Sequence, residues 1–302
     1  GVSHSNEVQY EVTIMDLLNK HAEQDRRGLT SDLWRNFPRH EILTLKDGSV
    51  GVGCQLDPGA PPYAAANAGA VLAGNGVRAF TDLTATIGGL TRAQYNGGQG
   101  FRMLASADND AAELQWGGIG EPFVISDTAA DIWELVFECH FRVDSITAND
   151  AAFFIGLASA QVLDGNFIAD NGADVADLDM VGLFHQHADT TGVDVIYQKA
   201  GSAFVVHEAD WGPTLAADTW YIFGMRYLPS TKKVDLYWGT GDRSTTAFSK
   251  DDNPILSTDI DDATFPDGDG LCPTIAIKGG HADDKALDIR TFACAQAAYA
   301  AD

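Results

Sequence analysis

Residues Glu134–Val143 read ELVFECHFRV, and this stretch decides the fold class. Every second residue is apolar, and most of the residues in between are charged or polar; the apolar set is Leu135, Phe137, Cys139 and Phe141. Because side chains alternate between the two faces of a strand, this pattern predicts a β-strand of an antiparallel sheet with one buried face.

Strand-like segments continue at short intervals after this stretch. They are AAFFIGL at 151–157, MVGLF at 180–184, VDVIYQK at 193–199, AFVVH at 203–207, TWYIFGMRYL at 219–228, KVDLYW at 233–238, PTIAIK at 273–278 and ALDIRTF at 286–292. The polar turn at 229–232 predicts a hairpin between its two neighbours. Several strands separated by polar turns indicate an all-β, antiparallel sandwich rather than a parallel βαβ sheet.

The beginning of the chain has a different pattern. Residues 12–26 carry apolar side chains at helical spacing, and Gly28 is well placed to end a helix; the apolar set is Ile14, Leu17, Leu18 and Ala22. Residues 29–43 (LTSDLWRNFPRHEIL) follow as an extended arm, with Trp34, Phe37 and Ile42 as anchors. A single amphipathic helix is marginally stable alone, so we expect this region to pack on its own domain or on another protein.

The predicted organisation is therefore a helix and attachment arm over residues 1–48 and a β-sandwich domain over 49–302. The sandwich pattern is clearest from residue 131. Residues 57–130 begin with the Gly/Ala/Pro-rich run DPGAPPYAAANAGAVLAGNG, which predicts an irregular surface excursion. Strand-like pieces appear at 49–56, 77–80, 101–104 and 113–116. The first is expected to add to the sandwich, and the sequence leaves open whether residues 57–130 complete the sandwich or form a separate lobe.

Charge and cysteine content exclude several functional classes. The chain has 43 acidic and 19 basic residues, and its net charge of −24 repels nucleic acids and anionic membranes. No apolar run of about 18 residues predicts a membrane span, and no signal peptide pattern is visible. The four cysteines show no CxxC spacing, so a zinc site is not predicted; Cys139 is expected to be a buried free thiol, and one disulfide is left open.

The order of the strands, together with FIGLA at 154–158 and KVDLYWGTG at 233–241, resembles the concanavalin A-like (laminin-G-like) jelly-roll domains of tailed-phage virion proteins. The resemblance covers about residues 29–56 and 131–293 and rests on no single motif. One departure is the turn Gly239-Thr240-Gly241-Asp242, where such domains often carry an Asp-Gly pair.

The resemblance implies a virion structural protein of the capsid decoration (cement) type, located on the capsid surface and not an enzyme. Its sandwich would face outward, and its arm would bind the major capsid protein. The partner-binding residues would be Leu17, Leu18, Trp34, Phe37 and Ile42. A homo-oligomer, with a trimer as one arrangement, is expected. The alternative is a carbohydrate-binding, lectin-like module on a fibre or spike, with or without Ca²⁺.

Three further kinds of site are predicted, each with a structural alternative. Sugar contact is predicted for Trp211 in the loop EADWGP, against a role as a loop plug over the core, and Trp220 is expected in the core. Calcium would bind near Asp164, Asp170, Asp174, Asp177 and Asp179, although aspartates are ordinary turn residues. His185 and His187 near Asp189 form a conceivable metal site, against a polar strand end. The Glu-x-Asp-x-Glu pattern of sandwich glycosidases is absent.

Overall fold

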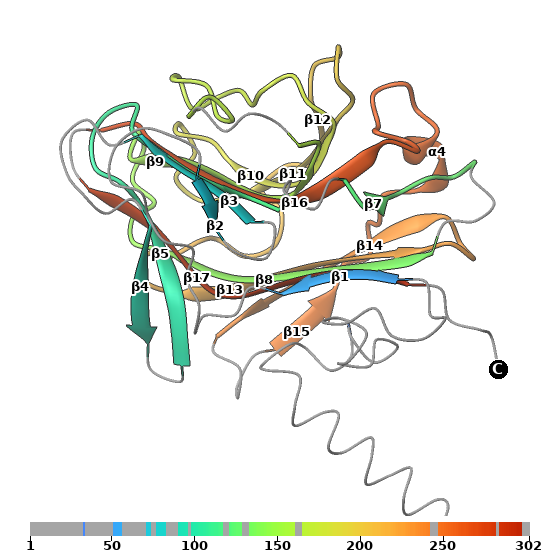
Figure 1. Cartoon of the computed structure of the whole chain (residues 1–302), viewed down its shortest axis with the longest axis horizontal. Helices are drawn as coiled ribbons and strands as arrows, with labels where there is room; N and C mark the ends of the chain where they lie inside the picture. The colour runs from blue at the N-terminus through green and yellow to red at the C-terminus, as the bar shows by residue number, and fades with distance from the viewer. Residues whose placement is uncertain are drawn as a thin grey trace, which may run out of the picture.

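The computed structural model describes residues 33, 51–55, 71–73, 77–82, 90–95, 98–116, 121–128, 133–160, 165–241, 247–281 and 284–297. Within these residues two antiparallel sheets pack face to face, one forming the lower layer of Figure 1 and the other the upper layer. This arrangement confirms the predicted all-β jelly-roll sandwich. The predicted helix at 12–26 and the anchors Leu17, Leu18, Trp34, Phe37 and Ile42 lie outside the described residues.

The first sheet has eight strands. In spatial order they are β15 (Ala247–Lys250), β14 (Lys233–Thr240), β13 (Trp220–Leu228), β8 (Glu134–Val143), β17 (Lys285–Ala297), β5 (Gly98–Ala105) and β4 (Leu90–Tyr95), and β1 (Gly51–Gln55) also pairs with β17. The long β17 therefore lies at the centre and joins strands that are far apart in the sequence.

The second sheet has nine strands. Their order is β12 (Val205–Glu208), β11 (Asp194–Gln198), β10 (Met180–His185), β9 (Ala151–Ala158), β16 (Gly270–Gly279), β6 (Ala111–Gln115), β3 (Val77–Asp82) and β2 (Val71–Ala73), and β7 (Phe123–Val124) also pairs with β16. A single turn of helix, α4 (Ser257–Ile260), precedes β16. No helix within the described ranges is long and apolar enough to cross a membrane.

Much of the region 57–130 takes part in the sandwich, where the sequence predicted an irregular excursion. Strands β2 to β7 all fall within it and pair into the two sheets. These strands include segments such as LTRAQY and GQGFRMLA. The strand-like pieces predicted at 77–80, 101–104 and 113–116 overlap β3, β5 and β6. Strands β2, β4 and β7 were not predicted, because they are short or lack a clear alternation of apolar side chains.

The core lies between the two sheets and uses the face of β8 that the sequence predicted. Leu135, Phe137, Cys139 and Phe141 are all buried in the main apolar cluster. The ring of Phe292 from β17 stacks on Trp116 at 4.4 Å and meets Phe137 edge-on at 5.1 Å. Cys139 is a buried free thiol, as expected, and its burial raises the thiol pKa.

The chain itself covers the outer face of the second sheet. Phe167 and Ile168, from the acidic segment 165–179, pack on outward-facing side chains of β9 and β10 in a separate buried cluster. The buried Lys278 holds this segment by donating to the Gly165 carbonyl at 2.9 Å. The buried Glu113 accepts hydrogen bonds from the amides of Gly165 and Phe167 at 3.3 and 2.8 Å. The segment therefore covers the outer face of the second sheet over β9 and β10.

Candidate functional site

The outer face of the first sheet carries three distinct features. A row of charged residues crosses β5, β17 and β8 and ends at Trp220 on β13. A hollow lies over Gly224 on β13, and a charged cleft lies beside the β13–β14 hairpin. We refer to them as the arginine row (Arg102, Asp288, Arg142 and Trp220), the Gly224 hollow and the hairpin cleft.

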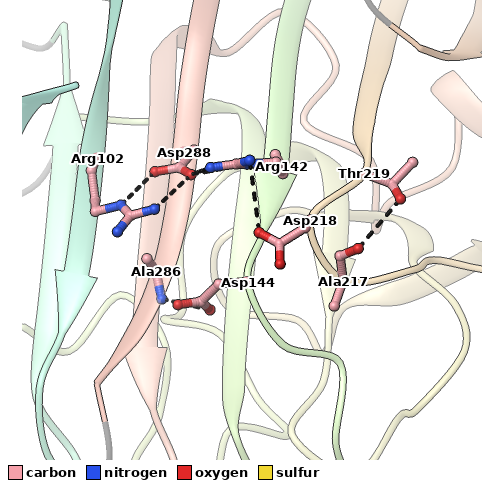
Figure 2. A network of polar contacts seen from close by, with 8 residues as sticks. All are labelled: Arg102, Arg142, Asp144, Ala217, Asp218, Thr219, Ala286 and Asp288. Atoms are coloured by element: carbon pink, nitrogen blue, oxygen red, sulfur yellow. Dashed lines mark hydrogen bonds and ion pairs between the residues drawn. The ribbon is translucent and has the colours of Figure 1, made fainter. Parts of the chain in front are cut away.

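The arginine row is built by strand register (Figure 2). Figure 2 shows Asp288 on β17 with Arg102 on β5 on one side and Arg142 on β8 on the other. The register also places Arg142 opposite Trp220 on β13. The Nε–H group of Arg102 donates a hydrogen bond to Asp288 Oδ1 at 2.7 Å, and its Nη2–H group donates one to Oδ2 at 3.0 Å. The Nη2–H and Nε–H groups of Arg142 both donate hydrogen bonds to Asp288 Oδ2, at 2.6 and 3.1 Å. One carboxylate therefore accepts four hydrogen bonds and links three strands.

The Asp288 carboxylate needs these partners because it is buried. Its side chain is 1% exposed, whereas the side chains of Arg142 and Arg102 are 20% and 39% exposed. A charge withdrawn from water is tolerated only when it is paired and hydrogen-bonded. The arginine row is thus a structural crosslink whose guanidinium groups also reach the surface.

Trp220 lies at the end of the arginine row rather than in the core, where the sequence placed it. The guanidinium carbons of Arg142 and Arg290 lie 5.3 and 5.9 Å from its ring centroid, within cation–π range. Tyr221 and Phe223 occupy the inward positions of β13, so Trp220 has the outward parity. At the same end of the row, the exposed Asp218 lies 3.7 Å from Arg142. The nearby Asp144 has a raised carboxyl pKa, mainly because of burial.

The Gly224 hollow is filled by Leu33, which belongs to the segment predicted as an arm. Leu33 is 1% exposed and clusters with Val136, Ala293 and Ala295, all on the outer face of the first sheet. A Cβ atom added to Gly224 would lie 2.7 Å from Leu33 Cδ2, so the missing side chain makes room for the leucine. Burying one leucine side chain contributes about 2 kcal/mol. The N-terminal segment is therefore anchored on this face at Leu33.

The hairpin cleft has a volume of about 300 Å³. Its lining residues are Leu228, Thr231, Lys233, Asp235, Lys250, Asp251, Asp252 and Pro254. Lys250 pairs with Asp235 at 2.7 Å, and Asp251 accepts a hydrogen bond from the indole of Trp211 at 2.6 Å. Within the part of the chain that the structure describes, Lys233 and Asp252 have no such partner. The cleft thus presents both a donor and an acceptor to solvent.

The aspartates proposed to bind calcium have separate roles where the structure describes them. Asp170 pairs with Lys278 at 2.8 Å, and Asp177 and Asp179 accept hydrogen bonds from the backbone amides of Gly201 and Ala200. The Asp174 side chain is exposed, and Asp164 lies outside the described residues. Among the residues with described positions, no three His, Cys, Asp or Glu side chains are grouped to hold a metal ion.

The two histidines of the HxH pattern are buried and bind different carbonyls. His185 Nδ1 lies 2.6 Å from the Gly192 carbonyl oxygen, and its ring stacks on Phe153. His187 Nε2 lies 3.1 Å from the Lys278 carbonyl oxygen. The carboxylate of Asp189 accepts hydrogen bonds from the backbone amides of Thr191 and Gly192, within the same turn. These contacts favour the interpretation as a structural strand end.

We expect His185 to make the fold less stable in mild acid. Burial lowers the pKa of its imidazole below the ordinary value of 6.5, so the unfolded chain binds this proton more readily. The stability contributed by neutral His185 is complete above about pH 6.5 and is lost as the pH falls through the lowered folded-state pKa. Urea unfolding between pH 7 and 5 should therefore have a shallower pH slope for His185→Asn, whose amide can replace Nδ1–H. Equal slopes for both proteins would contradict this prediction.

Trp211 plugs the core instead of presenting its ring to a ligand. It is 2% exposed and meets Phe223 edge-on at 5.7 Å, and its Nε1–H is bound by Asp251. This burial removes the exposed ring on which the predicted sugar contact depended. The position follows from the backbone, because the Trp211 amide donates to the Val193 carbonyl at 2.7 Å and draws the loop inward.

Sequence reasoning did not identify the arginine row or the hairpin cleft. Alternation placed Arg142 on the outer face, but the partners Arg102 and Asp288 come from strands whose order is not visible in one sequence. The cleft joins the 228–235 hairpin to residues 250–254 through the pairing of β14 with β15. The only sequence signal was the density of Lys and Asp in these two segments.

Comparisons with known proteins concern the fold alone. No family model matches the chain, and no curated protein sequence matches it. Peanut lectin, in complex with a nine-residue peptide, has a TM-score of 0.49 and 12% identity, covering 83% of this chain and all of the lectin. The carbohydrate recognition domain of Emp47p has a TM-score of 0.43 and 11% identity, covering 74% of this chain and 90% of that domain. A carbohydrate esterase from a Shiga toxin-encoding bacteriophage has a TM-score of 0.36 and 11% identity, covering 74% of this chain and 91% of the esterase.

Proposed function

We propose that this protein is a non-enzymatic carbohydrate-binding module that holds a neutral sugar in the hairpin cleft. The observation that carries the proposal is the mixed lining of the cleft, with Lys233 and Asp252 unpaired on its surface. Sugar hydroxyl groups both donate and accept hydrogen bonds, so they need both kinds of partner. Leu228 and Pro254 supply apolar contact for the sugar ring's C–H groups. The three aspartates outnumber the two lysines, which disfavours anionic glycans.

A binding role is favoured over catalysis because the described buried carboxylates are already bound to structural partners. Asp110 accepts a hydrogen bond from the Ser106 hydroxyl, and Glu113 accepts hydrogen bonds from backbone amides. Glu138 is paired with His140. Asp150, Asp235 and Asp288 are paired with Lys285, Lys250 and the two arginines of the row. A glycosidase instead needs two carboxyl groups facing one bond.

A neutral glycan array, followed by calorimetry on the best ligand, tests sugar binding. We expect Lys233→Ala and Asp252→Asn each to weaken binding about tenfold, the value of one lost hydrogen bond of roughly 1.4 kcal/mol. Lys199→Ala is the matched control, because Lys199 pairs with Asp269 away from the cleft. Affinity should be the same with a chelator present. An array without any bound neutral glycan, or wild-type affinity in both cleft variants, would refute the proposal.

Attachment to a virion is the second candidate function, and the buried Leu33 favours it. Leu33 is anchored on the sandwich, and the proposal assigns the contact with a second protein to its neighbours in the sequence. These would be Leu17, Leu18, Trp34, Phe37 and Ile42, with the major capsid protein as the partner. Trp34→Ala with Phe37→Ala should abolish co-sedimentation with capsids that lack this protein, and Leu256→Ala, at an exposed position on the sandwich, should not. Unchanged co-sedimentation of the double variant would exclude this attachment.

A further inference from the structure

The Gly224 hollow accommodates one leucine side chain. A Cβ atom on Gly224 would meet Leu33 Cδ2 at 2.7 Å, and Phe248 Cζ and Tyr237 Cβ at 3.4 Å. The rings of Tyr237 and Phe248 stack at 5.4 Å with an interplanar angle of 6° and form one wall. Ala293 and Ala295, which are small residues on β17, form the other side.

The chain between Leu33 and the sandwich is longer than this contact requires. Leu33 contacts Ala293 and Ala295, and the strand β1 pairs with the same part of β17, with Gln55 opposite Ala293 and Gly51 opposite Ala297. The hollow and the start of β1 are thus neighbours. Residues 34–50 lie between them in sequence, and 17 residues span up to about 60 Å when extended. The linker therefore has enough length for Leu33 to reach the hollow of an adjacent molecule.

We propose that the Gly224 hollow accepts Leu33 from a second copy of this chain, so that the N-terminal segments link neighbouring sandwiches. The exchanged contact is the same as the internal one, with the same leucine, hollow and ring wall. Exchange of an identical element therefore needs no new complementarity and is governed by concentration. It competes with the internal contact when the local protein concentration reaches the effective concentration of an intramolecular contact, which is in the millimolar range. This inference does not depend on sugar binding.

Disulfide trapping in full-length protein tests the exchange. Leu33→Cys and Ala293→Cys are placed on separate, differently tagged copies, mixed at about 1 mM and oxidised. A covalent heterodimer is expected, at least fivefold more abundant than for Leu33→Cys mixed with the exposed-site control Ala209→Cys. Adding Gly224→Val to the Ala293→Cys copy should remove the heterodimer, because the valine side chain fills the hollow.

The same pair of cysteines within one chain tests whether Leu33 occupies the Gly224 hollow. The double variant Leu33→Cys/Ala293→Cys should form an internal disulfide at micromolar concentration, and mixing it at about 1 mM should convert part of it to linked oligomers. An internal disulfide at every concentration, with a heterodimer yield no higher than the Ala209→Cys control, would overturn the exchange. Failure to form either disulfide would overturn the placement of Leu33 in the hollow. Thermal unfolding of each variant confirms that the sandwich remains folded.

Discussion

Replacing Gly156 by valine is expected to destabilise the sandwich by at least about 3 kcal/mol, a large part of a typical folding free energy. Gly156 on β9 faces Gly182 on β10 in the second sheet. A Cβ atom at Gly156 would lie 2.3 Å from the Val181 carbonyl oxygen and 2.7 Å from the Gly182 Cα. Both are backbone atoms of a central strand, so they cannot move aside as a flexible side chain would. The two strands would have to separate.

Urea unfolding at neutral pH measures this effect, and Gly201→Ala is the control. Gly201 has a φ of +88° and no atom within 4 Å of an added Cβ, so this variant carries only the cost of its backbone conformation, about 1 kcal/mol. The difference between the two variants in free energy of unfolding gives the cost of the steric clash at Gly156. If Gly156→Val were no less stable than Gly201→Ala, β9 and β10 could not pair as closely as described.

Asp288→Asn should destabilise the protein by about 3 kcal/mol. The buried carboxylate accepts four hydrogen bonds from Arg102 and Arg142, and a neutral amide would remove the buried negative charge that these two guanidinium groups share. Removing one partner of a buried ion pair costs about 3 to 5 kcal/mol. The lower value is expected here because both arginine side chains keep partial access to water.

The matched control for Asp288→Asn removes another carboxylate near the same arginine. Asp218 lies 3.7 Å from Arg142 but is 71% exposed, so Asp218→Asn should change stability by less than about 0.5 kcal/mol. Chemical unfolding of both variants at low and high salt gives the comparison, with only the Asp218 effect decreasing in salt. Equal losses for the two variants would show that Asp288 is not a buried crosslink.

The part of the fold that the sequence predicted is the part that follows strict alternation. Leu135, Phe137 and Cys139 faced the core as expected because a strand with one buried face must alternate. Between residues 71 and 115, the strand-like pieces predicted at 77–80, 101–104 and 113–116 overlap β3, β5 and β6, whereas β2 and β4 were not predicted because they are short or rich in polar residues. The positions of β6 and β5 are determined by pairing with β16 and β17, which lie far away in the sequence.

The candidate sites were harder to predict because they depend on which strands are neighbours. Trp211 looked like an exposed loop residue, yet its backbone hydrogen bond to Val193 holds it in the core. Asp170, Asp174 and Asp177 are exposed, as loop aspartates are expected to be, but Asp170 and Asp177 bind different structural partners. The arginine row needs the order β5–β17–β8–β13, which local patterns do not contain. Composition alone indicated only that the surface would be acidic.

The central position of β17 also determines when the first sheet can form during protein synthesis. The residues that β17 pairs with on β1 and β5 are translated long before it; Arg102, for example, precedes Asp288 by 186 positions. The first sheet therefore cannot close until residues 285–297 have left the ribosome. Until then β8 and β5 have unpaired edges, which are aggregation-prone, and such distant pairing makes folding slow. We expect the nascent chain to depend on chaperones until β17 is released.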